Sequence, residues 1–216
     1  MTPDAVVPAA SDTAGGVSPV ARVSERNLRA NALLAPVGAA DDVLAADAWG
    51  HGAEWVASVL ASVGVDPDEF EAATLFGLPG GDLRARPVLS LHGRVLGTKA
   101  LLTGEGVSYG YTHRAPRDTT VALVTGGYAQ GVVRSLGNVA DVVIDGRRHR
   151  IVGRVAMDVC VVDVDDARPP RGSGVVFFGD PEAGHPSLRE WTDATGWSAG
   201  EIVASVGARA VRTVIA

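Results

Sequence analysis

The stretch that decides the fold is "DVVIDGRRHRIVGRVAMDVCVVDV", residues 141–164. Apolar and polar residues alternate on both sides of Asp145-Gly146, a dipeptide that type I′ turns favour between two antiparallel strands. The sequence therefore predicts strands at 141–144 and 148–155 joined by a tight hairpin. The alternation resumes over 159–164 and predicts a third strand beside them.

The same period of two continues from Pro87 to the end of the chain. Further strands are predicted at 88–96, 120–124, 174–178 and 209–215. Two capping boxes, Ser187–Glu190 and Ser198–Glu201, predict short helices near 187–195 and 198–206. Residues 87–216 are thus predicted to form a mainly β, mostly antiparallel domain with short helices, long enough to fold alone.

The segment before Pro87 is predicted to be a small α/β unit. Over residues 22–65 we expect a helix near 26–34, a strand at 43–46 and a helix at 51–64. A strand, a glycine turn and a helix in this order are where α/β folds place their chemistry. Residues 66–86, rich in Pro and Gly, are predicted as a connector with one short apolar piece, Thr74–Phe76. Residues 1–21, rich in Ala, Pro and Ser, predict a disordered tail.

The composition indicates a globular protein that neither binds nucleic acid nor spans a membrane. The 216 residues are 46% hydrophobic and 20% charged, which suits a packed core. A net charge of −6, with Lys99 as the only lysine, argues against a nucleic-acid surface. There is no apolar run of ~20 residues and no signal-peptide pattern. Because the single Cys160 suits a reducing compartment, we expect a cytoplasmic protein.

Several short motifs do not carry the chemistry that they suggest. Residues 106–110 match the G-x-S-x-G of serine hydrolases, but that motif needs a helix directly after the serine, and a segment with Pro116 follows here. The five histidines are scattered and there is no second cysteine. Asp163, Asp165 and Asp166 lack the glycine and the distal glutamate of a calcium loop. No metal site is predicted.

Two pieces, "GGYAQG" at 126–131 and "AMD" at 156–158, allow two interpretations. Tyr128 stands between glycines after an apolar strand, which is typical of a side chain presented on an exposed turn. The same position also suits a core aromatic residue that closes the end of a barrel. From the residues alone the second interpretation, a core aromatic residue, is favoured.

Together these pieces resemble alanine racemase, a pyridoxal-phosphate enzyme of fold type III that interconverts L- and D-alanine. The resemblance runs through "RPVLSLHGRV", "GEGVSYGYTH", "VALVTGGYAQGVVRSLGN", "DGRRHRIVGRVAMDVCVVDV" and "ARAVRTV". Upstream, "ARVSERNLRAN", "VLAADAWGHGAEW" and "TLFGLPGGDLRARP" are similar to the first helix, to the strand and loop that carry the cofactor, and to the final strand of the family's β/α barrel.

The resemblance implies roles for individual residues. Tyr109 matches the second catalytic base, which this family uses in trans from one subunit to the next. Tyr128 matches the tyrosine that gates the substrate, and Met157 and Asp158 match a pair along the substrate carboxylate. Trp49 and Gly200 stand at positions of the family's cofactor site, where the latter is usually a phosphate-contacting tyrosine. Gln130 replaces the aspartate of the family's "GYADG".

Two departures set this chain apart from the family. Ala45 stands where the family has the lysine that holds pyridoxal phosphate, and an alanine has no amine for that linkage or for proton transfer. The family's barrel typically needs ~200–250 residues, but only the segment between Arg22 and Pro87 is present here. The chain is therefore predicted to keep the C-terminal β-domain and a remnant of the barrel.

Three hypotheses about function stay open at this point. The first is a truncated racemase-like protein, inactive alone, that acts as a binding or dimerisation module. The second is a functional alanine racemase that supplies D-alanine for peptidoglycan. The third is a gene remnant without a function. We expect a homodimer or a mixed dimer with a full-length racemase, in which Tyr109 completes the partner's site.

Overall fold

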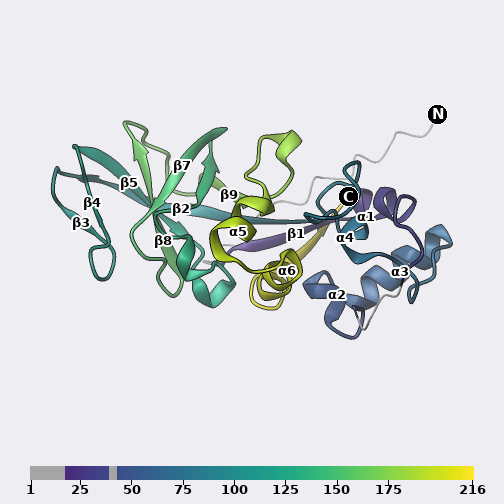
Figure 1. Cartoon of the computed structure of the whole chain (residues 1–216). Helices are drawn as coiled ribbons and strands as arrows, with labels where there is room; N and C mark the ends of the chain where they lie inside the picture. Colours follow the sequence, from purple (N-terminus) through teal and green to yellow (C-terminus); the bar gives the residue numbers. More distant parts are fainter. Residues whose placement is uncertain (1–17, 39–42) are drawn as a thin grey trace, which may run out of the picture.

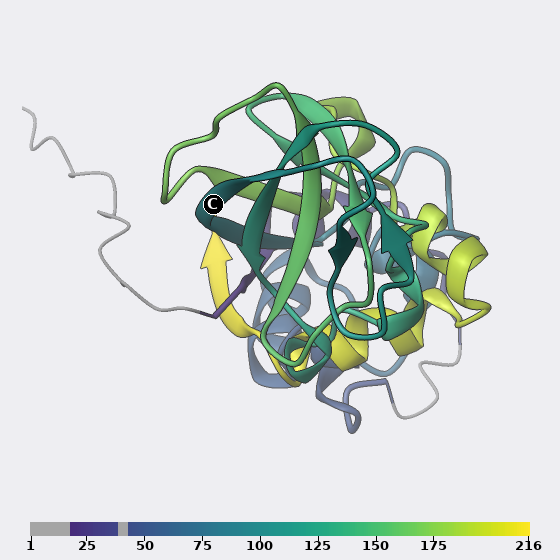
Figure 2. The same ribbon diagram turned by 90° about the vertical axis from the view of Figure 1, so that its left-hand side faces the viewer.

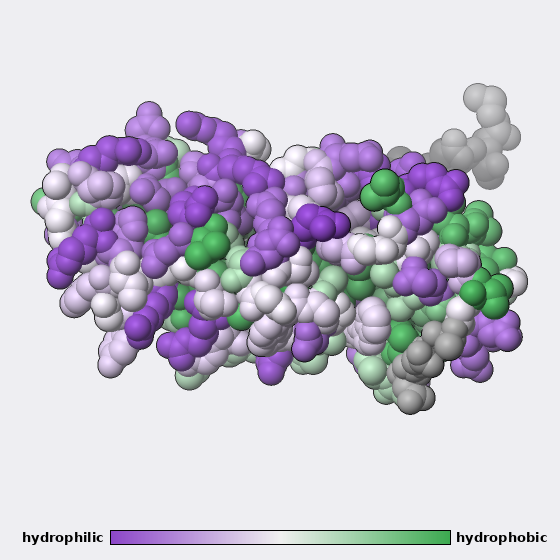
Figure 3. Space-filling view, in the orientation of Figure 1, coloured by the Kyte–Doolittle hydropathy of each residue, from purple (hydrophilic) through white to green (hydrophobic). Residues whose placement is uncertain are grey.

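The strands gather at one end of an elongated molecule and most of the helices at the other (Figure 1). The computed structural model describes residues 18–38 and 43–216. In the space-filling view, hydrophilic side chains dominate the β end, and apolar side chains gather over the helical end (Figure 3). The prediction of a mainly antiparallel β-domain with a few helices is confirmed.

Six strands close into a small antiparallel barrel. The strands of the molecule are β1 Val20–Ser24, β2 Leu89–Leu101, β3 Gly106–Val107, β4 His113–Arg114, β5 Thr119–Thr125, β6 Asp141–Ile144, β7 Arg147–Val152, β8 Val159–Asp165, β9 Gly174–Phe178 and β10 Val211–Ile215. The barrel follows the order β2-β5-β8-β7-β6-β9, and a further pairing of β9 with β2 closes it. Figure 2 looks into the end of this barrel that carries β3 and β4.

The hairpin predicted at Asp145-Gly146 is present. Both residues have positive φ, 49° at Asp145 and 75° at Gly146, as a type I′ turn requires. The strands β6 and β7 pair directly across this turn, with Ile144 opposite Arg147. The local sequence was sufficient here because a type I′ turn fixes the register of its two strands.

The strand pair β1–β10 extends the sheet beyond the barrel and was only half predicted. The strand at 209–215 is confirmed as β10, but Val20–Ser24 is a strand, so the predicted tail boundary at residue 21 is wrong. Most of that predicted tail, residues 1–17, lies outside the described residues. The partners of β1 are β10, in parallel, and β2, and both are far away in the sequence. No local pattern reveals such a strand.

The helices are α1 Glu25–Ala32, α2 Asp47–Gly50, α3 Ala53–Val63, α4 Ala72–Leu75, α5 Leu188–Thr195 and α6 Ala199–Gly207, with 3-10 turns η1 Tyr128–Gln130, η2 Arg134–Leu136 and η3 Pro181–Ala183. The four longer helices begin and end within two residues of the predicted bounds, and the short helices α2 and α4 were not predicted. The capping boxes at Ser187 and Ser198 are both formed, so the predictions of α5 and α6 are confirmed.

The strand predicted at 43–46 is wrong, and so is the final barrel strand that the resemblance implied around Thr74–Phe76. Residues 43–46 form turns, and Thr74–Phe76 lies in and just after α4. A strand of a β/α barrel needs parallel neighbours to satisfy its backbone hydrogen bonds. Among residues 18–38 and 43–216 the only parallel pair is β1–β10, so residues 43–46 have no such neighbour. At α4 the Glu71 carboxylate accepts hydrogen bonds from the Ala73 and Thr74 N–H groups, both at 2.8 Å, which favours a helix.

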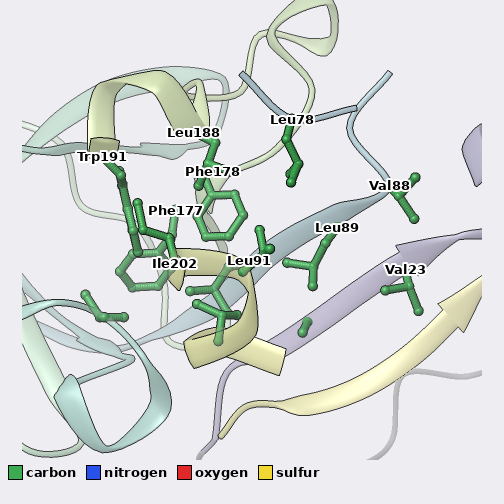
Figure 4. Close-up of a cluster of buried hydrophobic side chains, with 14 of the residues drawn as sticks. Val23, Leu78, Val88, Leu89, Leu91, Phe177, Phe178, Leu188, Trp191 and Ile202 are labelled. Carbon is green, nitrogen blue, oxygen red and sulfur yellow. The ribbon is translucent and has the colours of Figure 1, made fainter. Parts of the chain in front are cut away.

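The N-terminal helices and the β-domain share one hydrophobic core. The cluster of buried residues runs from Leu28 of α1 and Val56 of α3 to Leu91 of β2 and Trp191 of α5. Figure 4 shows the Trp191 ring beside Phe178, and their ring centroids are 4.9 Å apart at an angle of 69°. The N-terminal segment with α1 to α4 therefore packs on the β-domain and belongs to the same folding unit.

Helix α6 meets the turn α2 at a contact between two glycines. A Cβ atom at Gly207 would lie 2.2 Å from the Gly50 carbonyl oxygen and 2.5 Å from the Gly50 Cα atom. No side chain fits between two backbones this close. Gly207 itself has an ordinary helical φ, so its smallness is needed only for this contact.

Gly207→Ala is expected to lower the free energy of unfolding by about 2–3 kcal/mol, since the new methyl group forces the two backbones apart. The control is Gly174→Ala, because a Cβ at Gly174 meets nothing within 4 Å and its φ is ordinary. Urea unfolding of both variants measures the difference. Equal stability of the two variants would show that the contact does not hold α2 in place.

Candidate functional site

Tyr109 stands at the tip of a short hairpin formed by β3 and β4. The turn residues Ser108, Gly110 and Tyr111 have positive φ values of 60°, 81° and 46°. The Tyr109 side chain is 84% exposed. Strand β4 follows the turn, so Ser108 lacks the helix that a hydrolase nucleophile needs. The hairpin displays its tyrosine to the outside.

The barrel supports this hairpin from below. A Cβ at Gly153 would lie 2.8 Å from Ser108 Oγ, so the turn rests directly on the backbone after β7. The Asn138 side chain joins the two parts: its Oδ1 accepts a hydrogen bond from Gly153 N–H at 2.7 Å, and its Nδ2 donates to Thr112 Oγ1 at 3.2 Å. Tyr109 therefore projects from a fixed base.

Tyr128, Met157 and Asp158 come together at one end of the barrel. Gly126 N–H donates to Asp158 O at 2.9 Å, and Tyr128 N–H donates to Ala156 O at 3.0 Å. Tyr128 is half-buried under the Arg134 guanidinium, 4.8 Å from the ring centroid, and Met157 is exposed. The residues alone favoured a core aromatic at Tyr128, and this is wrong, because the side chain is only half-buried on a turn.

Gln130 links the two pieces of this turn. Its Oε1 accepts a hydrogen bond from Gly127 N–H at 3.0 Å, and its Nε2 donates to Asp158 Oδ1 at 2.8 Å. A carboxylate at this position would have no donor for Asp158 Oδ1, and the Gln130 amide supplies one.

Residues 47–50 form one left-handed turn at the other end of the molecule. Asp47, Ala48 and Trp49 have φ values of 53°, 49° and 49°, which cost non-glycine residues about 1 kcal/mol each. Asp47 holds the turn, because its Oδ1 accepts from Ala53 N–H at 3.0 Å and its Oδ2 pairs with Arg212 at 2.7 Å. Burial acts to raise the pKa of Asp47, but these two partners outweigh it and lower the pKa.

His51 is buried beneath this turn. Its ring stacks on Phe76, with centroids 4.1 Å apart and planes at 9°. Its Nδ1 lies 2.8 Å from the Ala48 carbonyl oxygen, so Nδ1 carries the proton and donates. Burial lowers the pKa of His51 to about 4. The ring is therefore neutral at physiological pH.

Ala45 and the pair Trp49–Gly200 lie close to this turn. Ala45 is exposed in a groove shared with His51, Trp55 and Arg212. A Cβ at Gly200 would lie 3.2 Å from the Trp49 ring, so the indole occupies the space that a side chain at Gly200 would fill. The structure brings Trp49 and Gly200 together and sets Ala45 in the neighbouring groove.

Hairpin β3–β4 and turn α2 stand at opposite ends of the molecule, whereas the turn at Tyr128 packs on α6, since a Cβ at Gly131 would lie 2.8 Å from Val206 Cα. Hairpin β3–β4, with Tyr109, lies at the far left of Figure 1, and turn α2, with Trp49, lies at the right. Sequence reasoning did not single out Arg212 or Arg134, although both fall inside stretches that carry the resemblance.

Among the described residues no group of three or more His, Cys, Asp or Glu is arranged to hold a metal ion. Nor does that part of the chain include a helix of the length and apolar character needed to cross a membrane.

The fold and the site together define a closed antiparallel barrel that displays a tyrosine on a short hairpin. Residues 88–214 match the family model described as "Alanine racemase, C-terminal domain". The chain belongs to the alanine racemase family through this domain.

Individual relatives agree with this assignment. The alanine racemase of Streptomyces coelicolor is 37% identical over 157 residues, which are 72% of this chain and 38% of that protein. A crystal structure of alanine racemase from D-cycloserine producing Streptomyces lavendulae has a TM-score of 0.64 at 29% identity and covers 79% of this chain and 54% of that one. Alanine racemase from Bartonella henselae, with covalently bound pyridoxal phosphate, has a TM-score of 0.61 at 29% identity, over 69% and 43% of the two chains. This chain thus spans well under two thirds of the length of these relatives.

The residues present do not fit a covalently bound pyridoxal phosphate. Ala45 offers no amine, and Lys99, the only lysine of the chain, lies in β2 beside β5. The Trp49 ring lies against Gly200, and the hollow of about 410 Å³ beside them is lined by no lysine. This part of the molecule therefore supports no step through the cofactor.

The pKa of His51 predicts how stability depends on pH. Because the folded pKa is about 4 and the ordinary value is 6.5, the unfolded chain takes up the proton first as the pH falls. The free energy of unfolding should therefore be constant in this respect above pH 6.5 and fall by about 2 kcal/mol on going to pH 5. Urea unfolding at pH 7.5 and pH 5 measures the change.

His51→Gln should flatten this pH dependence, since glutamine does not titrate. His185→Gln is the control: burial also lowers the pKa of His185, but that variant should keep the share of the slope due to His51. An unchanged slope in His51→Gln would mean that His51 does not carry the effect.

Proposed function

We propose that this chain is a racemase-derived pairing module without racemase activity of its own. It associates with a second copy of itself or with a full-length alanine racemase. The observation that carries the proposal is the separation of Tyr109 from Ala45 and Trp49 at opposite ends of one chain (Figure 1). A tyrosine so displayed has no counterpart within its own chain and is available to a second one.

The lack of activity is argued from the groove at Ala45. Racemisation in this family requires a lysine that holds the cofactor, and the relative from Bartonella henselae is described with pyridoxal phosphate covalently bound. Here a methyl group takes the place of the amine, and Asp47, His51 and Arg212 are already engaged with one another or with the backbone. Among the described residues His51 Nε2 has no hydrogen-bond partner, but it is buried beneath the turn and has no contact with solvent, so it is not placed to take a proton from an amino acid in this groove.

The pairing role is argued from the groups that are intact. The Tyr109 hairpin is braced on Gly153 and Asn138, and the turn at Tyr128 and Asp158 is fully hydrogen-bonded. A hydroxyl group presented on such a base loses little freedom on binding. In a mixed dimer, Tyr109 would supply its hydroxyl to the site of the intact racemase, while that subunit supplies the cofactor.

An uncovered apolar surface favours association. The N-terminal segment, which we interpret as the remnant of the barrel, exposes Leu33, Val37 and Leu83 to 74%, 80% and 100%. These side chains belong to the helical end, over which apolar groups gather in Figure 3. Patches of this kind mark protein interfaces. The net charge of −6 opposes loose aggregation but not a specific contact.

Ala45→Lys is expected to leave the protein without racemase activity, because the phosphate and ring contacts that hold the cofactor are missing as well. Purified variant and wild type are incubated with pyridoxal phosphate, and the borohydride-fixed absorbance and D-alanine formation are measured. Ala46→Lys, an exposed neighbour with the same change of charge, is the control for non-specific reaction. Turnover by the wild type would establish an active racemase, and turnover by Ala45→Lys alone would show that the rest of the cofactor site survives.

Light scattering of the protein, alone and with an intact racemase from the same cell, is expected to give a dimer or a mixed complex. Tyr109→Phe should leave the complex intact and lower the activity of the mixture, since the phenylalanine cannot exchange a proton. Tyr111→Phe, on the same hairpin and also exposed, is the matched control. A strict monomer in both samples, with no effect of Tyr109→Phe on the mixture, would contradict both forms of association.

A further inference from the structure

We propose that a hollow on the outer face of the barrel binds a small monocarboxylate with an apolar chain. The hollow lies between β3 and the face of the sheet formed by β2, β5 and β8, and has a volume of about 360 Å³. This is the lower part of the range typical of small-molecule sites. The proposal is independent of any racemase chemistry or pairing.

The floor of the hollow is apolar although it lies outside the barrel. Along β5, Ala122 and Val124 face the main core, so Val121 and Leu123 face the other way. Val121 belongs to a second, smaller cluster with Leu101 and Val107, and Leu123 remains exposed. Outward positions of a small barrel are usually polar, so an apolar patch at Val121 and Leu123 indicates a binding surface.

Gly97 creates the open space above this floor. It pairs with Leu123, and a Cβ built on it would meet nothing within 4 Å. Its φ lies outside the left-handed region, so the backbone does not require a glycine there. A larger residue would fit at position 97 without a steric clash, but its side chain would fill the hollow.

Lys99 supplies a charge at the rim. It is the only lysine of the chain, stands opposite Val121 and is exposed. Within residues 18–38 and 43–216 its ammonium group makes no ion pair, and no carboxylate lines the hollow. An unpaired cation beside an apolar floor favours a ligand with one negative group and an apolar body. The absence of lining acids disfavours amines and zwitterions.

Octanoate is the probe, followed by titration calorimetry and by amide chemical shifts of β2, β5 and β8. The wild type is expected to bind octanoate at least fivefold more tightly than octanol or octylamine. Lys99→Gln should weaken octanoate binding about fivefold and leave octanol unchanged, since a half-exposed ion pair contributes about that factor. Lys99→Arg, which keeps the charge, should stay within about twofold of the wild type.

Gly97→Leu should abolish binding of octanoate and octanol alike, with the circular dichroism of the wild type retained. If this variant does not fold, the pair Lys99→Gln and Lys99→Arg still decides the matter. Equal affinity for octanoate and octanol, or equal affinity of the two lysine variants for octanoate, would overturn the proposal. So would a loss of self-association in Gly97→Leu without any octanoate binding, because the hollow would then be covered by a second copy.

Discussion

The backbone of β2 hydrogen-bonds to three different strands along its thirteen residues. Its first half pairs with β1 and with β9, and its second half pairs with β5 beyond a bulge between Val95 and Gly97. Gly93 makes the crowding at this point possible, since a Cβ there would lie 2.5 Å from the Thr125 carbonyl oxygen. The pairing with β9 closes the barrel, and the pairing with β1 carries β10 and the helical end. The strand β2 thus connects the barrel to the β1–β10 pair and to the helical end.

This arrangement separates Tyr109 from the turn at Asp47–Gly50, so the two do not meet within one chain. Tyr109 projects from one end of the long axis that β2 defines, and the turn at Asp47–Gly50 lies at the other (Figure 1). Each of the two is well supported by its own surroundings, Tyr109 through Asn138 and the turn through Arg212. Under the proposed function, Tyr109 and the position of Ala45 are therefore held apart within one chain, and a second chain would bring complementary groups to either end.

The contacts around the turn at Asp47–Gly50 support one another. Trp49 lies against Gly200, and a larger residue at Gly200 would collide with the indole. Asp47 and Arg212, which are distant in the sequence, form an ion pair, and Arg212 also donates to the Gly50 carbonyl oxygen at 3.0 Å. His51 is buried and neutral beneath them. These contacts hold the turn in place through side-chain and backbone groups of the protein.

The sequence by itself determined the elements whose signals are local. The turn at Asp145-Gly146 and the capping boxes at Ser187 and Ser198 each act within a few residues, and all three were predicted correctly. The motifs around Tyr109 and Tyr128 were likewise sufficient to identify the family. The tertiary structure alone decided that residues 43–46 are not a strand, that Val20–Ser24 is one, and that Gly50 touches Gly207. A strand forms only where another backbone is in reach to satisfy its hydrogen bonds, and a glycine contact needs two segments brought together. Both depend on which distant parts of the chain become neighbours, and a local pattern does not contain that information.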